Sequence, residues 1–347
     1  MDLLPTQEQQ QIVDTAANFL ANEFAVSQLL TLSEGEALVS REQLQKIAGL
    51  GWLGIGLPEE LEGVGYGLSE EALLFVELGR SLMPPSLLGS VLGARMAGLS
   101  DAFDLLHTIV QGEMKVALAV VHPGRDAKIG ETVDGEFLIY EPQEADLVLV
   151  ADDCGAALLP LASLQCKAGE RCIDETLDIA SGLATNASAI CFVPTEKDNI
   201  FQRGAILTSA MLLGIAEATL ARSVDYAKER EQFGKPIGSF QAIKHYCAEM
   251  AIRCESVRAL LYHASITVQG QIAAGAFDTF SLKALAIDAA QLNANTAIQI
   301  HGGMGFTREM DIHLFVKRAQ VLGTLFGSER YHLKRLLSEP VADQERY

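Results

Sequence analysis

The sequence lacks the features that would direct the protein to a membrane, a secretory pathway or nucleic acid. Its opening residues, MDLLPTQEQQ, contain neither the basic nor the apolar segment of a signal or transit peptide. The longest apolar run, residues 205–216, is far shorter than the roughly 20 residues of a membrane span. Lys and Arg are few, 26 against 45 Asp and Glu, and the formal net charge of −19 repels nucleic acid and anionic lipid surfaces. We therefore expect a cytoplasmic protein with no membrane span and no nucleic-acid partner.

Cysteine motifs are also absent. The six cysteines lie at positions 154, 166, 172, 191, 247 and 254, without a CxxC pair and without a spacing typical of metal ligands. Cys247 and Cys254 are separated by about 10 Å along a predicted helix, which is too far for a disulfide. We expect reduced thiols, most of them buried, and no metal site.

What the sequence does contain is enough apolar material for two or three domains. It has 347 residues, and 49% of them are hydrophobic. Residues 1–115 have the periodicity and the capping boxes of helices. Residues 116–200 consist of short β-prone runs separated by Gly, Pro, Asp and Asn. Residues 201–347 are helical again. The predicted fold is therefore a multi-domain α and β protein: an N-terminal helical domain, a small antiparallel β sandwich or partial barrel, and a C-terminal helical bundle.

The predicted elements follow from these patterns. The expected strands are 116–121, 136–140, 146–150, 156–160, 171–177 and 188–193. The expected helices of the bundle are 203–232, 240–270, 276–300, 311–323 and 328–338.

One glycine pattern suggests a dinucleotide-binding fold and is rejected on its context. Gly49, Gly51 and Gly54 match GxGxxG, but they follow a predicted helix and no βαβ unit surrounds them. We interpret these glycines as the exit of a helix into a long loop.

Residues 226–244, YAKEREQFGKPIGSFQAIK, place several ligand-binding residue types in one turn. The predicted helix carries Arg230 and Phe233 in its last turn, where residues three apart face the same way. The chain then turns at Gly234 and starts a new helix with Ser239 as its N-cap. An arginine beside an aromatic ring suits an anionic ligand that contains a ring system. Taken alone, Arg230 is better explained as a charge that complements a helix C-terminus, with Phe233 as a core residue.

A second segment, residues 299–306, has the sequence QIHGGMGF and is called the glycine segment below. A predicted helix ends here, and Gly302 and Gly303 would let backbone amides approach a ligand closely. Gln299 and His301 precede them in the last helical turn. Taken alone, this segment is an ordinary glycine C-cap with His301 bonded to the backbone.

Together, the two motifs resemble the C-terminal signatures of the acyl-CoA dehydrogenases. RxQFGxPIxxFQ is present at 230–241, QIHGGMGF at 299–306, and the order of domains matches over essentially the whole chain. The resemblance implies a flavoenzyme in which FAD lies between two subunits, so that an oligomer is required. The residues that would hold the ADP half of FAD are Arg230, Phe233, Gln241, Gln299, Gly302 and Gly303.

The same resemblance implies α,β-dehydrogenation of an acyl-CoA, which needs a carboxylate base, and the sequence departs from the family there. Read forward from Lys317-Arg318-Ala319, the usual glutamate position is occupied by Phe326. Some relatives carry the base at the start of the first bundle helix, but that position falls at Gly204 in this chain. Glu329, three residues beyond Phe326, is a candidate for a displaced base, although an acidic residue there also favours the start of the next helix.

A third departure lies in the β domain, which is also shorter than usual. Residues 120–127, VVHPGRDA, replace a segment that normally carries Thr or Ser, and the usual flavin-contacting Trp-Ile-Thr/Ser falls on residues 138–140, LIY. The half-site for the flavin ring therefore looks degraded, whereas the half-site for ADP looks intact.

These departures resemble the non-catalytic subunit of heterotetrameric acyl-CoA dehydrogenases of steroid or bile-acid side-chain degradation. The leading hypothesis is a chain that completes the FAD site of a homologous catalytic partner, which would hold the acyl-CoA. One alternative is a self-sufficient homo-oligomer whose base is Glu309, Asp311 or Glu329. The other is a flavin-free scaffold.

Overall fold

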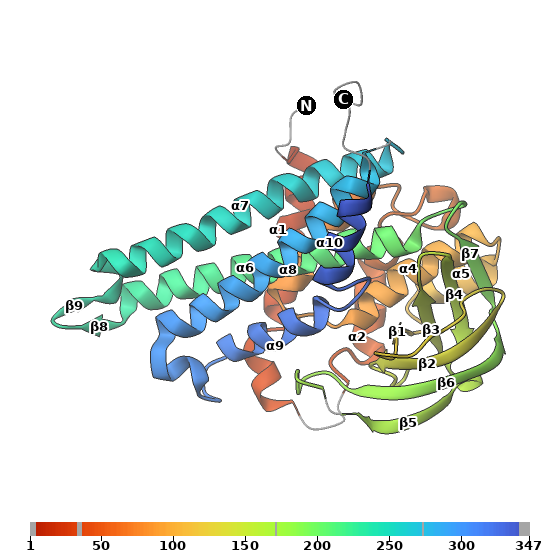
Figure 1. Ribbon diagram of the computed structural model, residues 1–347, viewed down its shortest axis with the longest axis horizontal. Coiled ribbons are helices and arrows are strands. Elements are labelled where there is room, and N and C mark those ends of the chain that lie inside the picture. Colours follow the sequence, from red (N-terminus) through yellow and green to blue (C-terminus); the bar gives the residue numbers. More distant parts are fainter. Residues whose placement is uncertain (1–4, 33–36, 171, 273, 340–347) are drawn as a thin grey trace. The chain divides into compact units, whose positions relative to one another are not determined.

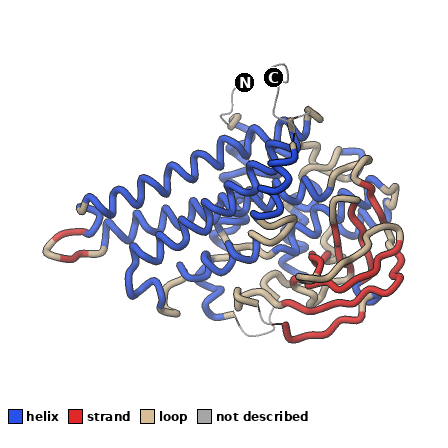
Figure 2. The backbone as a smooth tube through the Cα atoms, viewed as in Figure 1, coloured by secondary structure: helices blue, strands red, loops and turns tan. Residues whose placement is uncertain are grey.

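The computed structural model describes residues 5–32, 37–170, 172–272 and 274–339. Helices, then strands, then helices follow one another along the chain, which confirms the predicted fold class (Figures 1 and 2). By its internal contacts the chain divides into two compact units. One comprises residues 32–71 and 84–205, and the other comprises residues up to 31, 72–83 and those from 206 onward. Each unit is described by itself.

The N-terminal region is helical, and its caps match the sequence. Thr6 and Gln9 bond reciprocally at the start of the first helix, with the Gln9 amide donating to Thr6 Oγ1 over 3.2 Å and the Thr6 amide donating to Gln9 Oε1 over 2.9 Å. Ser40 and Gln43 repeat this capping box. The helices are α1 (Gln7–Glu23), α2 (Arg41–Gly49), α3 (Leu68–Arg80), α4 (Pro85–Leu99) and α5 (Phe103–Val110).

The GxGxxG pattern lies where its context indicated. Gly49 is the last residue of α2, and Gly51 adopts a left-handed φ of 76° before a 3₁₀ turn at Trp52–Gly54. No strand precedes these glycines in the described part of residues 1–115, so the pattern is a helix exit.

The β region forms one sheet with seven strands among the described residues, in the order β5-β6-β2-β1-β3-β4-β7. All neighbouring strands pair antiparallel except β1 and β3, which are parallel, with Leu118 opposite Leu149. The expected all-antiparallel arrangement was therefore wrong at this pair. The strands are β1 (Val116–Val121), β2 (Thr132–Tyr140), β3 (Leu147–Ala151), β4 (Gly155–Pro160), β5 (Gln165–Glu170), β6 (Ile179–Ser188) and β7 (Cys191–Pro194).

The strand expected at 171–177 was also wrong: residues 172–177 form a loop, and residue 171 lies outside the described residues. Asp174 fixes this loop locally, because its carboxylate accepts hydrogen bonds from both the amide and the hydroxyl of Thr176. A short Asp side chain that bonds to the backbone two residues on favours a turn over a strand.

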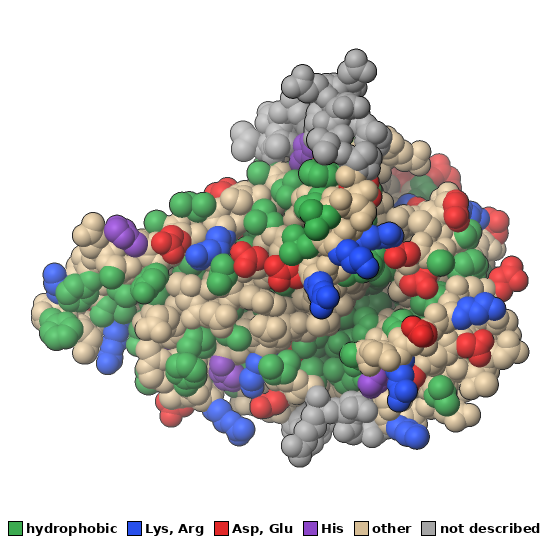
Figure 3. Space-filling view, viewed as in Figure 1, with side chains coloured by type: hydrophobic (Ala, Val, Ile, Leu, Met, Phe, Trp, Pro, Cys, Tyr) green, Lys and Arg blue, Asp and Glu red, His purple; other side chains and the backbone are tan. Residues whose placement is uncertain are grey.

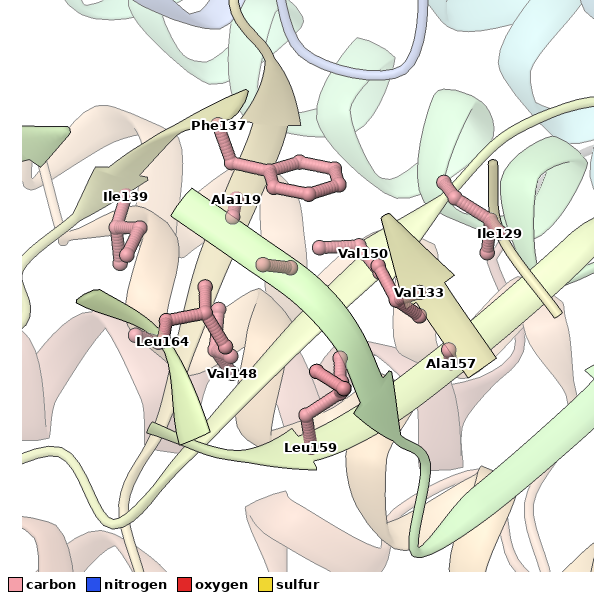
Figure 4. Packing of buried hydrophobic residues seen from close by; sticks show 13 residues of the cluster. Ala119, Ile129, Val133, Phe137, Ile139, Val148, Val150, Ala157, Leu159 and Leu164 are labelled. Carbon is pink, nitrogen blue, oxygen red and sulfur yellow. The ribbon is translucent and has the colours of Figure 1, made fainter. Parts of the chain in front are cut away.

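The core of the sheet is a cluster of aliphatic side chains around Phe137 (Figure 4). Figure 4 shows Phe137 and Ile139 from β2 with Val148 and Val150 from β3, and all four are essentially inaccessible to solvent. Alternate residues of each strand point to this side, as the two-residue periodicity of a strand requires. Burial of this apolar area is the main force that holds the small domain together.

The C-terminal region consists of long helices, a two-stranded hairpin and short 3₁₀ turns. The elements are α6 (Ile200–Glu229), β8 (Glu231–Gln232), β9 (Lys235–Pro236), α7 (Gln241–Gln269), α8 (Gly275–His301), α9 (Ile312–Leu322) and α10 (Glu329–Ser338). Along α7, the predicted core-facing stripe is fully buried from Met250 onward, at Cys254, Val257 and Leu261, whereas Ile243 and Cys247 are only half-buried.

Helix α6 is the central helix of this region. Glycine allows it to approach α3 closely, since a Cβ atom at Gly79 would lie 2.1 Å from the carbonyl oxygen of Met211. By length and composition α6 is apolar enough to cross a membrane, but 89% of its most apolar window is buried within the protein. This burial is that of a core helix, and its hydrophobicity is explained by packing.

The thiols are more exposed than expected. Cys191 and Cys254 are buried, Cys172 and Cys247 are half-buried, and Cys154 and Cys166 are exposed. The expectation that most cysteines are buried was therefore wrong. Burial raises the pKa of Cys254 to about 12, so this thiol remains protonated and unreactive at neutral pH.

Candidate functional site

The Arg230 segment forms a hairpin instead of a helix end. Helix α6 stops at Glu229, and β8 and β9 pair antiparallel with Gln232 opposite Lys235, which leaves Phe233 and Gly234 as the two loop residues. The amide of Ile237 donates to the carbonyl oxygen of Arg230 over 2.8 Å and closes the base of the hairpin. The prediction that Arg230 and Phe233 share a helical turn was therefore wrong. Both side chains are nevertheless exposed at the end of α6.

The loop of this hairpin holds an aromatic ring in solvent. Phe233 and Gly234 have φ values of 54° and 78°, the pair of positive values that a two-residue hairpin turn needs. Gly234 meets this requirement without strain, but Phe233 does not. The Phe233 side chain is 92% exposed, and its ring meets only the edge of Phe240, 6.1 Å away between centroids. Figure 3 shows hydrophobic and basic side chains together at this end of α6 and α7.

Helix α7 starts one residue later than the predicted N-cap implied. Ser239 is the last residue of a 3₁₀ turn, Ile237–Ser239, while Phe240 is the N-cap residue and makes no side-chain capping bond. The close approach of Gly238 to α6 explains this turn, because a Cβ atom there would lie 2.9 Å from the carbonyl oxygen of Ala227. Gln241 is the first residue of α7, and its side chain is exposed.

The glycine segment folds back against the helix that precedes it. Helix α8 ends at His301, Gly302 has a left-handed φ of 59°, and Gly302–Phe306 form a 3₁₀ turn. Gly305 makes the return possible, since a Cβ atom there would lie 2.9 Å from the carbonyl oxygen of Ile298. Gln299, Gly302 and Gly303 are all exposed, as the prediction required of ligand-binding residues.

A contact between two rings links the end of α6 to the glycine segment. Tyr226 in the last turn of α6 stacks on His301 at the end of α8, with ring centroids 4.3 Å apart and planes 24° from parallel. The Tyr226 hydroxyl also donates to the carbonyl oxygen of His301 over 3.4 Å. Sequence reasoning placed His301 in the glycine segment but assigned no role to Tyr226, and only the folded arrangement reveals this contact.

His301 is held as a neutral ring. It is buried, and its Nδ1 donates to the carbonyl oxygen of Ala297 over 2.7 Å. Burial lowers the pKa of His301, more than the hydrogen bond to Ala297 and the nearby Asp311 raise it. The imidazole therefore packs on Tyr226 uncharged at neutral pH.

An ion pair holds Asp311, five residues beyond the glycine segment. Arg222 on α6 contacts Asp311, directly before α9, with Nη2 and Oδ2 3.1 Å apart. The same guanidinium lies 4.5 Å from the ring centroid of Phe315 on α9. Asp311 was a candidate base in the homo-oligomer alternative, but its carboxylate is bound by Arg222. Glu309, the neighbouring candidate, is exposed.

The chemistry of the exposed groups suits the ADP half of FAD. Arg230 supplies a guanidinium for phosphate oxygens, Phe233 an aromatic face for a base, and Gln241 and Gln299 supply carboxamides. Side chains at Gly302 and Gly303 would meet no other atom within 4 Å, so this backbone faces open space. Among the described residues, no group of three or more His, Cys, Asp and Glu could hold a metal ion.

Phe326, the residue expected at the usual base position, is buried. Phe326 is 5% exposed and adopts a left-handed φ of 52°, and its carbonyl oxygen accepts a hydrogen bond of 2.8 Å from Nε2 of the buried His332. Glu329 lies in the first turn of α10, after Ser328, whose hydroxyl caps that helix by accepting from the Tyr331 amide. Such a location suits a carboxylate that stabilises a helix N-terminus.

A buried ion pair lies beside Gly204, the second position considered for the base. Arg203, beside Gly204, contacts Glu71 of α3 with 2.6 Å between Nη2 and Oε2, and both side chains are almost inaccessible. Burial raises the pKa of Glu71, against the effect of Arg203, and lowers that of Arg203. Gly56 leaves room for the pair, since a Cβ atom there would lie 1.9 Å from Glu71 Oε1. Sequence reasoning missed Glu71 because no motif marks it.

Of the residues at the expected flavin-contact positions, Leu138 and Ile139 are apolar, whereas Tyr140 carries a hydroxyl. Positions 138–140 lie on β2, where Ile139 and Tyr140 are buried and Leu138 is half-buried. The VVHPGRDA run begins at the end of β1 and continues into the loop before β2.

Comparison with known proteins places this arrangement in a family. Models of the acyl-CoA dehydrogenase N-terminal and C-terminal domains match residues 6–99 and 197–339. The chain is 32% identical over 284 residues to the acyl-CoA dehydrogenase IpdE2 of Mycolicibacterium smegmatis, covering 82% of each sequence. It belongs to the acyl-CoA dehydrogenase family.

Solved acyl-CoA dehydrogenase structures share the fold. The ChsE4-ChsE5 complex from Mycobacterium tuberculosis contains a chain that matches with a TM-score of 0.85 and 23% identity, covering 99% of this chain and 100% of that one. The Tcur3481-Tcur3483 steroid ACAD gives a TM-score of 0.85 and 24% identity, with 96% and 97% covered. Acyl-CoA dehydrogenases are oxidoreductases that bind FAD.

Proposed function

We propose that this chain is the FAD-completing, non-catalytic subunit of a hetero-oligomeric acyl-CoA dehydrogenase. The observation that carries the proposal is an ADP-type site with all its residues exposed, on a chain whose base position holds Phe326. The domains would be residues 1–115, 116–200 and 201–347. The homologous partner would hold the acyl-CoA and supply the carboxylate, and this chain would supply Arg230, Phe233, Gln241, Gln299, Gly302 and Gly303 to the shared FAD.

The surroundings of three of the four carboxylates considered as a base support a non-catalytic role, and the fourth, Glu309, is exposed. Proton abstraction requires a carboxylate within hydrogen-bonding reach of the substrate. Glu71 and Asp311 are bound by arginines, and Glu329 lies at a helix N-terminus. FAD, when bound, would accept the hydride, and this chain's part would be to hold its phosphates and adenine.

The relatives support a paired assembly. One structural neighbour is a ChsE4-ChsE5 complex, and another is a Tcur3481-Tcur3483 steroid ACAD. We propose by analogy a partner encoded close to this chain, with the same motifs and an intact glutamate, and a steroid side-chain CoA thioester as the substrate.

Expression with and without the partner tests the proposal against its rivals. The chain should be colourless and inactive alone, and it should yield a yellow, active complex when co-expressed with a dehydrogenase-like chain from the same gene neighbourhood. A yellow, active homo-oligomer would show that the chain is self-sufficient. A colourless complex would reduce its role to a flavin-free scaffold.

Substitution of Arg230 tests the cofactor site directly. In the co-expressed complex, Arg230→Ala should weaken FAD binding about ten- to a hundredfold, since a charge-assisted hydrogen bond contributes roughly 1.5 to 3 kcal/mol. FAD retention would be measured by flavin absorbance after gel filtration. The matched control is Lys228→Ala, which removes a neighbouring exposed cation that pairs only with Asp225 on its own helix. If both variants retain FAD equally well, Arg230 serves only as a charge at a helix end.

A further inference from the structure

We propose that Tyr226 and Arg222 are positioning residues that hold the chain on either side of Gly302 and Gly303, at His301 and at Asp311, in its ligand-binding shape. This inference rests on the proposed FAD site and adds two residues to it. Neither residue belongs to the two motifs that define that site.

The first contact fixes the start of the segment. The Tyr226 ring covers the His301 imidazole at 4.3 Å, and its hydroxyl donates to the carbonyl oxygen of the same residue. His301 is also tied to its own helix through Ala297. The residue directly before the exposed Gly302 is therefore held on both sides.

The second contact fixes the chain at Asp311, five residues beyond the end of the glycine segment. Arg222 bonds both carboxylate oxygens of Asp311, with its Nε 3.4 Å from Oδ1 and its Nη2 3.1 Å from Oδ2, while its guanidinium lies over the Phe315 ring. Asp311 makes no side-chain cap at the start of α9, so its carboxylate is turned to α6. The side chains of Arg222 and Asp311 are 32% and 21% exposed, and an ion pair that is partly shielded from water is stronger than one on the open surface.

Both supports come from one face of one helix. Arg222 and Tyr226 are four residues apart on α6, so they lie one above the other. The next residue, Ala227, is the one against which Gly238 packs after the hairpin. The last two turns of α6 thus contact both the turn after the Arg230 hairpin and the chain on either side of Gly302 and Gly303.

This support matters because the glycine segment has little of its own. Gly302 and Gly303 lack side chains that could lock their backbone, and glycine loses more conformational freedom on ordering than any other residue. If the segment were free, a ligand would have to supply that ordering free energy on binding. Contacts that hold the chain on both sides of these glycines remove part of the ordering free energy. They should therefore increase the affinity for FAD without touching it.

The test uses the co-expressed complex and measures FAD affinity by titration of the flavin-depleted protein, followed by flavin fluorescence. Tyr226→Leu should weaken FAD binding about tenfold, and Tyr226→Phe, which keeps the stacked ring, should stay within about threefold of the wild type. Arg222→Gln should also weaken binding about tenfold. The matched control is Arg253→Gln, which breaks an ion pair with Glu249 within α7 and a hydrogen bond to Asn293 of α8, and it should leave FAD affinity unchanged.

A double-mutant cycle keeps the proposal testable if Tyr226→Leu fails to fold. Asp311→Asn removes the charge of the partner, and the double variant Arg222→Gln/Asp311→Asn should bind FAD no worse than Arg222→Gln alone, because both changes break the same contact. The melting temperature of the flavin-free complex should fall no further in these variants than in Arg253→Gln.

The outcomes separate this inference from the proposed function. If Arg230→Ala loses FAD while Tyr226→Leu and Arg222→Gln retain it, the positioning role is wrong and the FAD site stands. Additive losses of affinity in the cycle would also overturn the positioning role. If the complex binds no FAD, or if Arg230→Ala binds it normally, the proposed function itself fails.

Discussion

At the scale of single residues, His301 makes the candidate site sensitive to pH. Its imidazole is 4% exposed and packs between Tyr226 and its own helix. Burial lowers its pKa below the ordinary value of 6.5, and among its charged neighbours Asp311 raises the pKa while Arg222 lowers it. The protonated ring therefore fits the folded protein less well than the neutral ring.

This depressed pKa predicts the direction in which stability changes with pH. The unfolded chain takes up a proton at His301 near pH 6.5, before the folded chain does, so folding free energy is lost as the pH falls below about 6.5. Between pH 7.5 and 5.5 the wild type should lose more free energy of unfolding than His301→Phe, which cannot take up the proton. Urea unfolding of both proteins at the two pH values measures this difference. The same pH dependence in both would show that His301 titrates normally in the folded protein.

The residues of the site were predictable only in part. Two sequence motifs predict cofactor-binding residues that are all exposed, and their role in binding stays a prediction: Arg230, Phe233, Gln241, Gln299, Gly302 and Gly303. Tyr226, Arg222 and Glu71 were missed as contact-making residues because each acts through a partner far away in sequence. Periodicity and caps describe residues that are close along the chain, and they say nothing about pairs such as Arg222 and Asp311, 89 residues apart.

At the scale of elements, the β8–β9 hairpin explains why the predicted helix end was wrong. The residues before Gly234 are compatible with a helix, and their periodicity extends α6 to residue 232. A two-residue turn, however, pairs Gln232 with Lys235 and gives the Arg230 carbonyl oxygen a partner in Ile237. These bonds depend on the chain turning back, so local propensity could not predict them. The same limit applies to the parallel pairing of β1 and β3, which depends on strands that are not consecutive in the chain.

The strained residue in this hairpin leads to a prediction. Phe233 is held at φ 54°, where a bulky side chain costs about 1 to 2 kcal/mol, although the ring gains little from packing at 92% exposure. Phe233→Asn should leave folding stability equal or slightly higher, because Asn tolerates this conformation. It should also weaken FAD binding by the co-expressed complex about tenfold, since stacking of a base on an aromatic ring contributes about 1 to 3 kcal/mol.

The measurement pairs thermal melting of the flavin-free complex with FAD titration. Gly234→Ala is the control for strain alone, because it adds a methyl group at a left-handed residue and leaves the Phe233 ring in place. Gly234→Ala should lower the free energy of unfolding of the hairpin, and its effect on the free energy of FAD binding should be smaller. If Phe233→Asn destabilises the complex and leaves FAD affinity unchanged, the ring serves packing against Phe240 and has no role in binding.

At the scale of the whole molecule, the division of the chain into helical and β regions followed from composition and periodicity alone. Gly, Pro, Asp and Asn punctuate the β region, and the capping boxes at Thr6 and Ser40 lie where the helices begin. The family followed from two motifs in register. In the proposed assembly the base would come from a partner, and this sequence carries no information about the residues of that partner.

Restoring the missing carboxylate tests whether only the base was lost. Phe326→Glu places a carboxylate at the usual position, but dehydrogenation also requires the flavin ring and the acyl chain to be bound, and the β-domain positions expected to contact the ring hold LIY at 138–140 in place of the usual Trp-Ile-Thr/Ser. The variant expressed alone should therefore show no acyl-CoA dehydrogenase activity above the wild type. Because position 326 is 5% exposed, it should also lose roughly 1 to 3 kcal/mol of stability from burying a polar group.

Turnover with artificial electron acceptors and urea unfolding measure the two effects of this substitution. The wild-type co-complex serves as the positive control, because it shows that the assay detects a complete site. Phe326→Gln is the matched variant, with a similar polarity and no base, and separates loss of stability from gain of chemistry. If Phe326→Glu, expressed without a partner, is active and Phe326→Gln is not, this chain still binds the flavin ring and the acyl chain by itself. Its only deficit would then be the base, and the chain would have lost catalysis at a single position without giving up the rest of the site to a partner.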